Sequence, residues 1–92
     1  MTHNINGNIT ERMTILGDVG AASFPAWISR HARKLGLSGG ISDRDAGRII
    51  LELTGPQELL DMMEMGCLLG PIDVWVETIK REPSPPSAQH LI

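Results

Sequence analysis

The sequence has no tyrosine, one phenylalanine and a single cysteine, Cys67. One cysteine excludes a disulfide within the chain and is typical of a reducing compartment. The net charge of −3 provides no basic field to attract nucleic acid. No apolar run approaches the roughly 20 residues of a membrane span, and residues 1–10 lack the apolar core of a signal peptide. These absences favour a cytoplasmic protein that binds neither nucleic acid nor a membrane.

Metal-binding and nucleophilic motifs are also missing. No His, Cys or acidic residues have the spacing of metal ligands, so we expect no metal and no other cofactor. Ser23 precedes a predicted helix and is interpreted as its N-cap, because His31 is a poor candidate base about two turns further along. His31 itself is interpreted as a surface residue, and Cys67 as an apolar position of a second helix.

The chain is long enough for one domain with a modest core, since 41% of its 92 residues are hydrophobic. Residues 1–10 are polar and are predicted to form a flexible leader. Residues 82–92 are rich in proline and serine, which favours a tail that pairs in no sheet. The folded domain is therefore predicted over residues 11–81.

Hydrophobic periodicity within that domain predicts four strands and two helices. The strands are expected at 12–16, 37–43, 48–54 and 72–79, and the helices at 24–35 and 57–67. The order β-α-β-β-α-β is typical of an α+β, ferredoxin-like fold, the split β-α-β sandwich. In it a four-stranded antiparallel sheet, with strand order 4-1-3-2, packs both helices on one face and leaves the other open.

Several apolar side chains are assigned to faces by the same periodicity. The first helix is expected to bury Phe24 and Ile28 and to end at Gly36 in a left-handed cap. In the second helix, at least two of Met62, Met63 and Met65 are predicted to face the sheet.

Three apolar residues are predicted on the open face of the sheet, namely Leu16, Ile50 and Trp75. One interpretation is a partner patch that binds a second copy, another protein or the chain's own tail. The alternative is scattered surface hydrophobic residues, which are common.

The segment from Gly17 to Phe24 joins the end of a strand to the start of a helix. Such a glycine-bearing loop directs backbone N–H groups at an anion, so a small anion such as phosphate or sulfate is the expected ligand. The predicted binding loop comprises Gly17, Val19, Gly20, Ala21, Ala22, Ser23 and Phe24. No Arg, Lys or His occurs between Gly17 and Ser29, and Pro25 lies in the first turn of the helix.

These residues resemble the acylphosphatase family, whose loop pattern is G-x-V-Q-G-V-G-F-R. The loop matches this pattern at Gly17-x-Val19 and Phe24 without a gap. The resemblance extends over roughly residues 12–80, where the other matching residues are Ala32, Leu35-Gly36-Leu37, Gly39, Gly47, Gly55, Gly70-Pro71, Val74 and Val76. The resemblance implies the sandwich fold predicted above. It also implies hydrolysis of acyl phosphates such as acetyl or carbamoyl phosphate.

The family's two catalytic residues have no counterpart in the matching positions. Its arginine, which binds the phosphate, falls on Pro25, and its asparagine, which positions the attacking water, falls on Asp43. The resemblance therefore predicts a domain whose hydrolysis is absent or strongly impaired and which binds a small anion or a protein. The alternative is an acylphosphatase with substituted residues, in which Arg44 or Arg48 turns toward the loop; otherwise these arginines are solvated hairpin charges.

Overall fold

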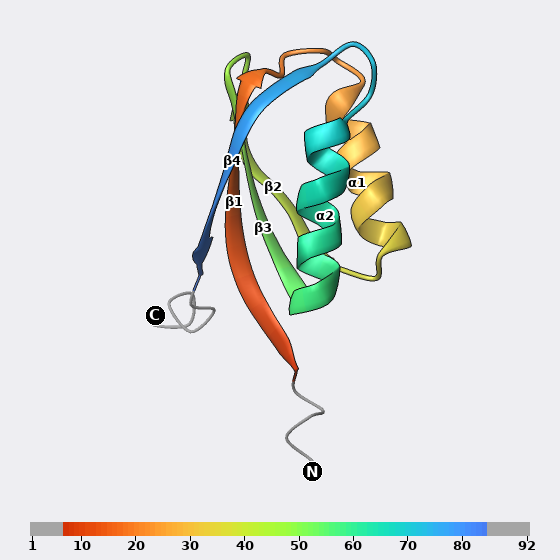
Figure 1. Cartoon of the computed structure of the whole chain (residues 1–92), viewed down its shortest axis with the longest axis vertical. Coiled ribbons are helices and arrows are strands. Elements are labelled where there is room, and N and C mark those ends of the chain that lie inside the picture. The colour runs from red at the N-terminus through yellow and green to blue at the C-terminus, as the bar shows by residue number, and fades with distance from the viewer. Residues whose placement is uncertain (1–6, 85–92) are drawn as a thin grey trace.

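The structure, a computed structural model, describes residues 7–84. Its elements follow the predicted order along the chain (Figure 1): β1 (Asn8–Asp18), α1 (Phe24–Lys34), β2 (Ser38–Asp45), β3 (Arg48–Pro56), α2 (Gln57–Leu69) and β4 (Trp75–Pro83). No helix in this part of the chain is long and apolar enough to cross a membrane.

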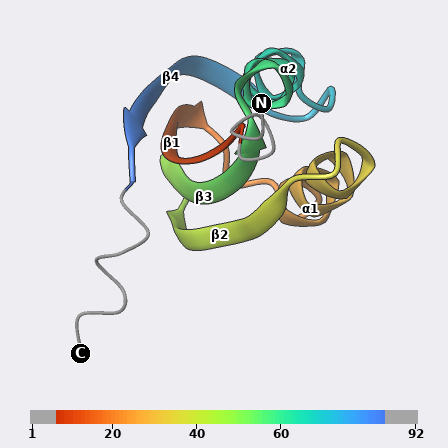
Figure 2. The same cartoon turned by 90° about the horizontal axis from the view of Figure 1, so that it is seen from below.

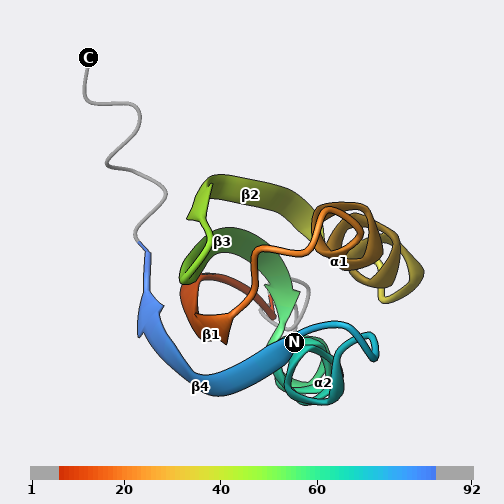
Figure 3. The ribbon, with the colours of Figure 1, turned by 90° about the horizontal axis from the view of Figure 1, so that it is seen from above.

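The four strands form one antiparallel sheet in the order β2-β3-β1-β4, which confirms the predicted topology. Seen end-on, the sheet is a curved layer with both helices on the same side (Figures 2 and 3). The two edges of the sheet are β2 and β4, and the two central strands are β3 and β1.

The core lies between the sheet and the helices. Directly paired residues of antiparallel strands share a face, and the buried residues of β1 and β3 are the odd-numbered ones, as in the pair Met13 and Leu51. The helices complete the core with Phe24, Ile28, Ala32, Leu60, Met63 and Cys67. Even-numbered residues of β1 and β3 therefore face the open side of the sheet.

Helix α1 begins at Phe24 as predicted, but the Ser23 hydroxyl does not cap it. Ser23 Oγ instead donates to the Asp73 carboxylate at 3.0 Å. The other end is confirmed: Gly36 has a φ of 76°, its N–H donates to the Arg33 carbonyl, and the Leu37 N–H donates to the Ala32 carbonyl. These two bonds satisfy carbonyl groups that the last helical turn leaves free.

The predicted boundaries of the leader and the tail were wrong by a few residues. Strand β1 begins at Asn8, because its first residues pair with the end of β3 at Gly55 and Pro56. Strand β4 includes Glu82 and Pro83, and an edge strand tolerates a proline where no N–H is needed. The rest of the predicted leader and tail lies outside the described residues.

The prediction for the methionines of α2 was also wrong. Met63 alone of the three is buried, while Met62 is 50% exposed and Met65 61% exposed. The side of α2 that contacts the sheet follows Leu60, Met63 and Cys67. A residue directly before or two places after Met63 is turned well away from that side by the helical rotation.

Candidate functional site

The loop between β1 and α1 is attached to the turn between β2 and β3. The Gly17 N–H donates to the Gly47 carbonyl at 3.2 Å, and the Val19 N–H donates to the Ala46 carbonyl at 3.0 Å. The turn is itself fixed by the Gly47 N–H, which donates to Asp45 Oδ1 at 2.9 Å. The loop therefore has a defined backbone next to the hairpin.

Four consecutive amides of the loop lack a hydrogen-bond acceptor within residues 7–84. They belong to Gly20, Ala21, Ala22 and Ser23, directly before α1. The amide of Phe24 differs, because it donates to the Ala21 carbonyl at 3.1 Å and its ring is buried in the core. Of the predicted anion-binding residues, these four therefore have free donors, whereas Gly17, Val19 and Phe24 use theirs to hold the loop.

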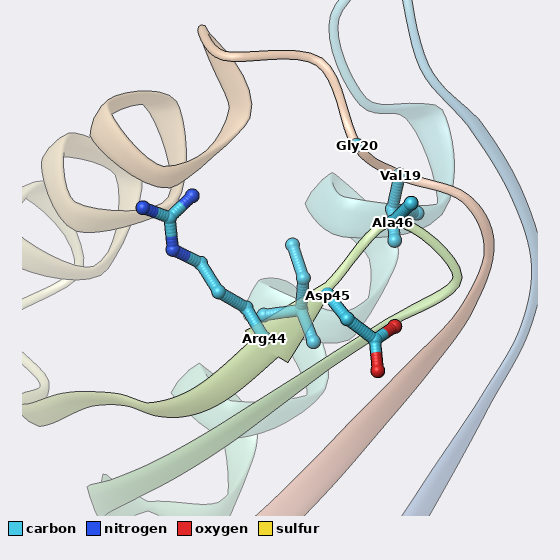
Figure 4. A pocket seen from close by; sticks show the side chains of 6 residues that line it. Val19, Gly20, Arg44, Asp45 and Ala46 are labelled. Carbon is cyan, nitrogen blue, oxygen red and sulfur yellow. The ribbon is translucent and has the colours of Figure 1, made fainter.

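A pocket of about 250 Å³ opens between this loop and the hairpin (Figure 4), and it is lined by Val19, Gly20, Arg44, Asp45, Ala46 and Ile49. Arg44 pairs with the buried Ile49 and so extends on the helix side of the sheet. Asp45 pairs with Arg48 on the opposite face. Figure 4 shows the Arg44 and Asp45 side chains pointing in opposite directions. The charged side chain that the pocket presents on its helix side is therefore that of Arg44.

Asp43 does not line this pocket. It pairs with Ile50 on the open face, where its carboxylate meets the Arg48 guanidinium at 3.3 Å. The cause is a register shift between Ile41 and Asp43, a β-bulge at Ser42, which reverses the faces of the two following residues. Asp43, the position matched to the family's asparagine, therefore lies away from the loop, and of the two hairpin arginines only Arg44 lies at the pocket.

Strict alternation from Ile41 would place Asp43 inward and Arg44 outward. Arg44 was predictable from the sequence only as one of two arginines beside Asp43, because no residue type in the strand signals the bulge. Arg44 is located by its pairing with the buried Ile49, and that pairing is known only from the register of the two strands.

The start of α1 already lies close to a negative charge. Asp73, in the turn before β4, accepts a hydrogen bond from Ser23 Oγ at 3.0 Å. A carboxylate near a helix N-terminus is favoured by the helix dipole. An incoming anion at the amides of Ala22 and Ser23 would therefore meet some repulsion from Asp73.

Pro25 occupies the second residue of α1 and supplies neither a charge nor an N–H. His31, on the same helix, is not the surface residue that was expected. Its ring stacks on Trp27 at a centroid distance of 4.9 Å, and its Nε2 atom is buried without a hydrogen-bond partner in the described structure. A Cβ atom at Gly66 of α2 would collide with this ring, so His31 is packed between the helices.

The three residues of the predicted partner patch lie on the open face in adjacent rows, but polar residues separate them. Trp75 is 67% exposed and pairs with Asp18, while Leu16 pairs with Arg48 and Ile50 with Thr14. Binding of a second copy or another protein through this patch stays a prediction.

Comparisons with known proteins agree on one family. A family model described as Acylphosphatase matches residues 11–90. An acylphosphatase from Azorhizobium caulinodans is 31% identical over 80 residues, which cover 87% of this chain and 80% of that protein. The structure of an acylphosphatase from Coxiella burnetii is similar with a TM-score of 0.80 at 21% identity, covering 92% of this chain and 90% of that one. The acylphosphatase from Bacillus subtilis gives 0.75 at 25% identity, over 83% and 84% of the two chains.

Proposed function

This chain belongs to the acylphosphatase family, and we propose that it binds a small phosphorylated anion at the loop 17–24 while hydrolysing acyl phosphates weakly or not at all. The observation that carries the proposal is a loop with four free amides whose neighbouring helix begins with Phe24-Pro25. The four free amides support binding, and the proline at the start of the helix supports the loss of catalysis.

Binding is supported by the donors and by the size of the pocket. Backbone N–H groups at the start of a helix favour an anion, and those of Gly20 to Ser23 have no acceptor within residues 7–84. The pocket of about 250 Å³ is smaller than the usual site of a drug-sized molecule. A phosphate group with a short acyl substituent suits such a volume.

Weak hydrolysis is supported by the residues at the two matched positions. Pro25 replaces a guanidinium that would bind phosphate through two parallel hydrogen bonds. Loss of one such stabilising donor typically reduces the rate by on the order of 10²–10³. Asp43, the second matched residue, is paired with Arg48 on the open face and is not positioned to orient water in the pocket.

The alternative function is an acylphosphatase that uses different residues. The position of Arg44 at the pocket favours it, and so does the name of the relative from Azorhizobium caulinodans. The two functions share the binding step and differ in turnover.

Both parts are tested with inorganic phosphate and benzoyl phosphate. In a titration with inorganic phosphate followed by amide NMR, we expect saturating shifts at Gly20 to Ser23, and none in a sodium chloride titration of equal ionic strength. The absence of phosphate-specific shifts would refute the binding proposal. Turnover of benzoyl phosphate at the rate of the Bacillus subtilis acylphosphatase, assayed in parallel, would refute impaired hydrolysis and establish the alternative.

A further inference from the structure

Arg44 is the charged side chain that lines the pocket on the helix side, and it comes from β2 instead of α1. We infer that Arg44 supplies the guanidinium that binds the phosphate group, in place of the arginine that is missing from the start of α1. This inference rests on the proposed function, since it names a ligand residue of the same site.

The β-bulge at Ser42 places Arg44 there. Because both Ser42 and Asp43 lie opposite Ile50, the next residue faces the helix side beside Ile49. Without the bulge Arg44 would lie on the open face, and the pocket would be lined by Asp43. The irregularity in β2 therefore exchanges a carboxylate for a guanidinium at the wall of the pocket, a change of two charge units in favour of an anion.

The charge of Arg44 is also available. No carboxylate within residues 7–84 forms an ion pair with Arg44. Arg48, only four residues away, meets Asp43 at 3.3 Å and Asp45 at 3.9 Å. An unpaired guanidinium in the same pocket as the free amide of Gly20 is a suitable receptor for phosphate, because both donate hydrogen bonds to its oxygens.

The direction of approach distinguishes this arrangement from one with an arginine on the helix. Arg44 reaches the pocket from the hairpin, and Gly20, the first residue with a free amide, lines the pocket from the loop. The guanidinium and this amide would hold the phosphate group from two sides. Asp43, the residue matched to the family's water-positioning asparagine, lies on the open face and not in this pocket, which agrees with binding without efficient turnover.

Arg48 provides a matched control, since it is an arginine of the same hairpin on the opposite face. We expect Arg44→Gln to weaken the binding of inorganic phosphate by about tenfold or more. Arg44→Lys should lie between Arg44→Gln and the unchanged protein, because it keeps the charge and loses the planar donor pair. Arg48→Gln should change the dissociation constant by less than about twofold.

Amide NMR measures the dissociation constants and reports whether each variant is folded. If the unchanged protein binds phosphate and Arg44→Gln has a dissociation constant within twofold of it, the role of Arg44 is refuted and the proposed function stays intact. Failure of the unchanged protein to bind phosphate would refute both. Should Arg44→Gln not fold, the Arg44 Nε–H resonance of the unchanged protein decides: a phosphate-dependent shift that saturates together with the loop amides supports the inference, and an unchanged resonance overturns it.

Discussion

At Gly17 the backbone of β1 approaches β4 so closely that a side chain has no room. The residue has a φ of 149°, which L residues with a side chain rarely adopt, and a Cβ atom would collide with the carbonyl oxygen of Trp75. Gly17 is also where the pairing of β1 with β4 shifts register. The glycine is therefore required by the geometry that begins the loop, whatever ligand the loop binds.

Gly17→Ala is expected to lower the free energy of unfolding by about 2 kcal/mol or more, because it combines a strained φ with a backbone collision. Urea denaturation measures the change. Gly40→Ala is the matched control, since a Cβ atom there would have no neighbour within 4 Å. Equal stability of the two variants would contradict the close approach of β1 and β4.

For Asp43 and Arg44, the sequence identified the residues but not the face of the sheet on which each side chain lies. The sequence alone identified the loop, the proline that follows Phe24 and the two hairpin arginines. It did not show which of these side chains reach the pocket, because a single unpaired residue, Ser42, reverses the alternation of β2. Bulges depend on the pairing of both strands, and one strand's sequence does not contain that information.

At the scale of elements, α2 shows that periodicity predicts a helix correctly without predicting which of its apolar residues are buried. The predicted helix exists and buries Leu60, Met63 and Cys67, but its methionines divide between the core and the solvent. An apolar residue type predicts burial only where the helix meets the sheet. The same limit explains the strand ends, because Asn8 and Pro83 are in strands through their partners on neighbouring strands and not through their own propensities.

The position of Cys67 in α2 leads to a pH dependence of stability. Burial raises the pKa of its thiol to about 12, with a smaller contribution from the nearby Glu64 carboxylate. The thiol of an unfolded chain titrates near pH 8.5. Between these values the unfolded state loses a proton that the folded state keeps, so stability falls as the pH rises.

Urea denaturation at pH 8 and pH 10.5 is therefore expected to show an additional loss of about 2 kcal/mol in the unchanged protein relative to Cys67→Ala. The absolute stability of Cys67→Ala will be lower because of the cavity, so the comparison is between the two pH dependences. The chain has no tyrosine, which removes the phenol that otherwise titrates in this range. An equal loss of unfolding free energy between the two pH values in both proteins would show that the buried thiol does not cause the pH dependence.

At the scale of the whole molecule, the fold brings together two connections that are far apart in the sequence. The loop after β1 and the turn after β2 meet because β1 and β3 are neighbours in the sheet (Figures 1 and 4). The resulting pocket is lined by Gly20, whose amide is free, from the loop and by Arg44 from the hairpin. A family loop, a helix that begins with Phe24-Pro25 and a guanidinium from the hairpin together favour a protein that binds an anion and rarely transforms it.

The strand order and the two-layer architecture were predictable from the sequence, because six periodic segments in this order have few ways to bury their apolar faces. The pocket was predictable only in part. Its loop was found from Gly17 and Phe24, while its hairpin wall depends on a register that only the three-dimensional structure shows.

We infer that this chain keeps the family's binding loop and has lost hydrolysis through the replacement of the helix arginine by Pro25. The most direct test is the rate of benzoyl phosphate hydrolysis by the unchanged protein and by Pro25→Arg, with residue 43 left unchanged because it lies on the open face. We predict a rate near the uncatalysed background for the unchanged protein and a rate at least about tenfold higher for Pro25→Arg. Hydrolysis by the unchanged protein at the rate of the Bacillus subtilis acylphosphatase, with no gain in Pro25→Arg, would contradict the account.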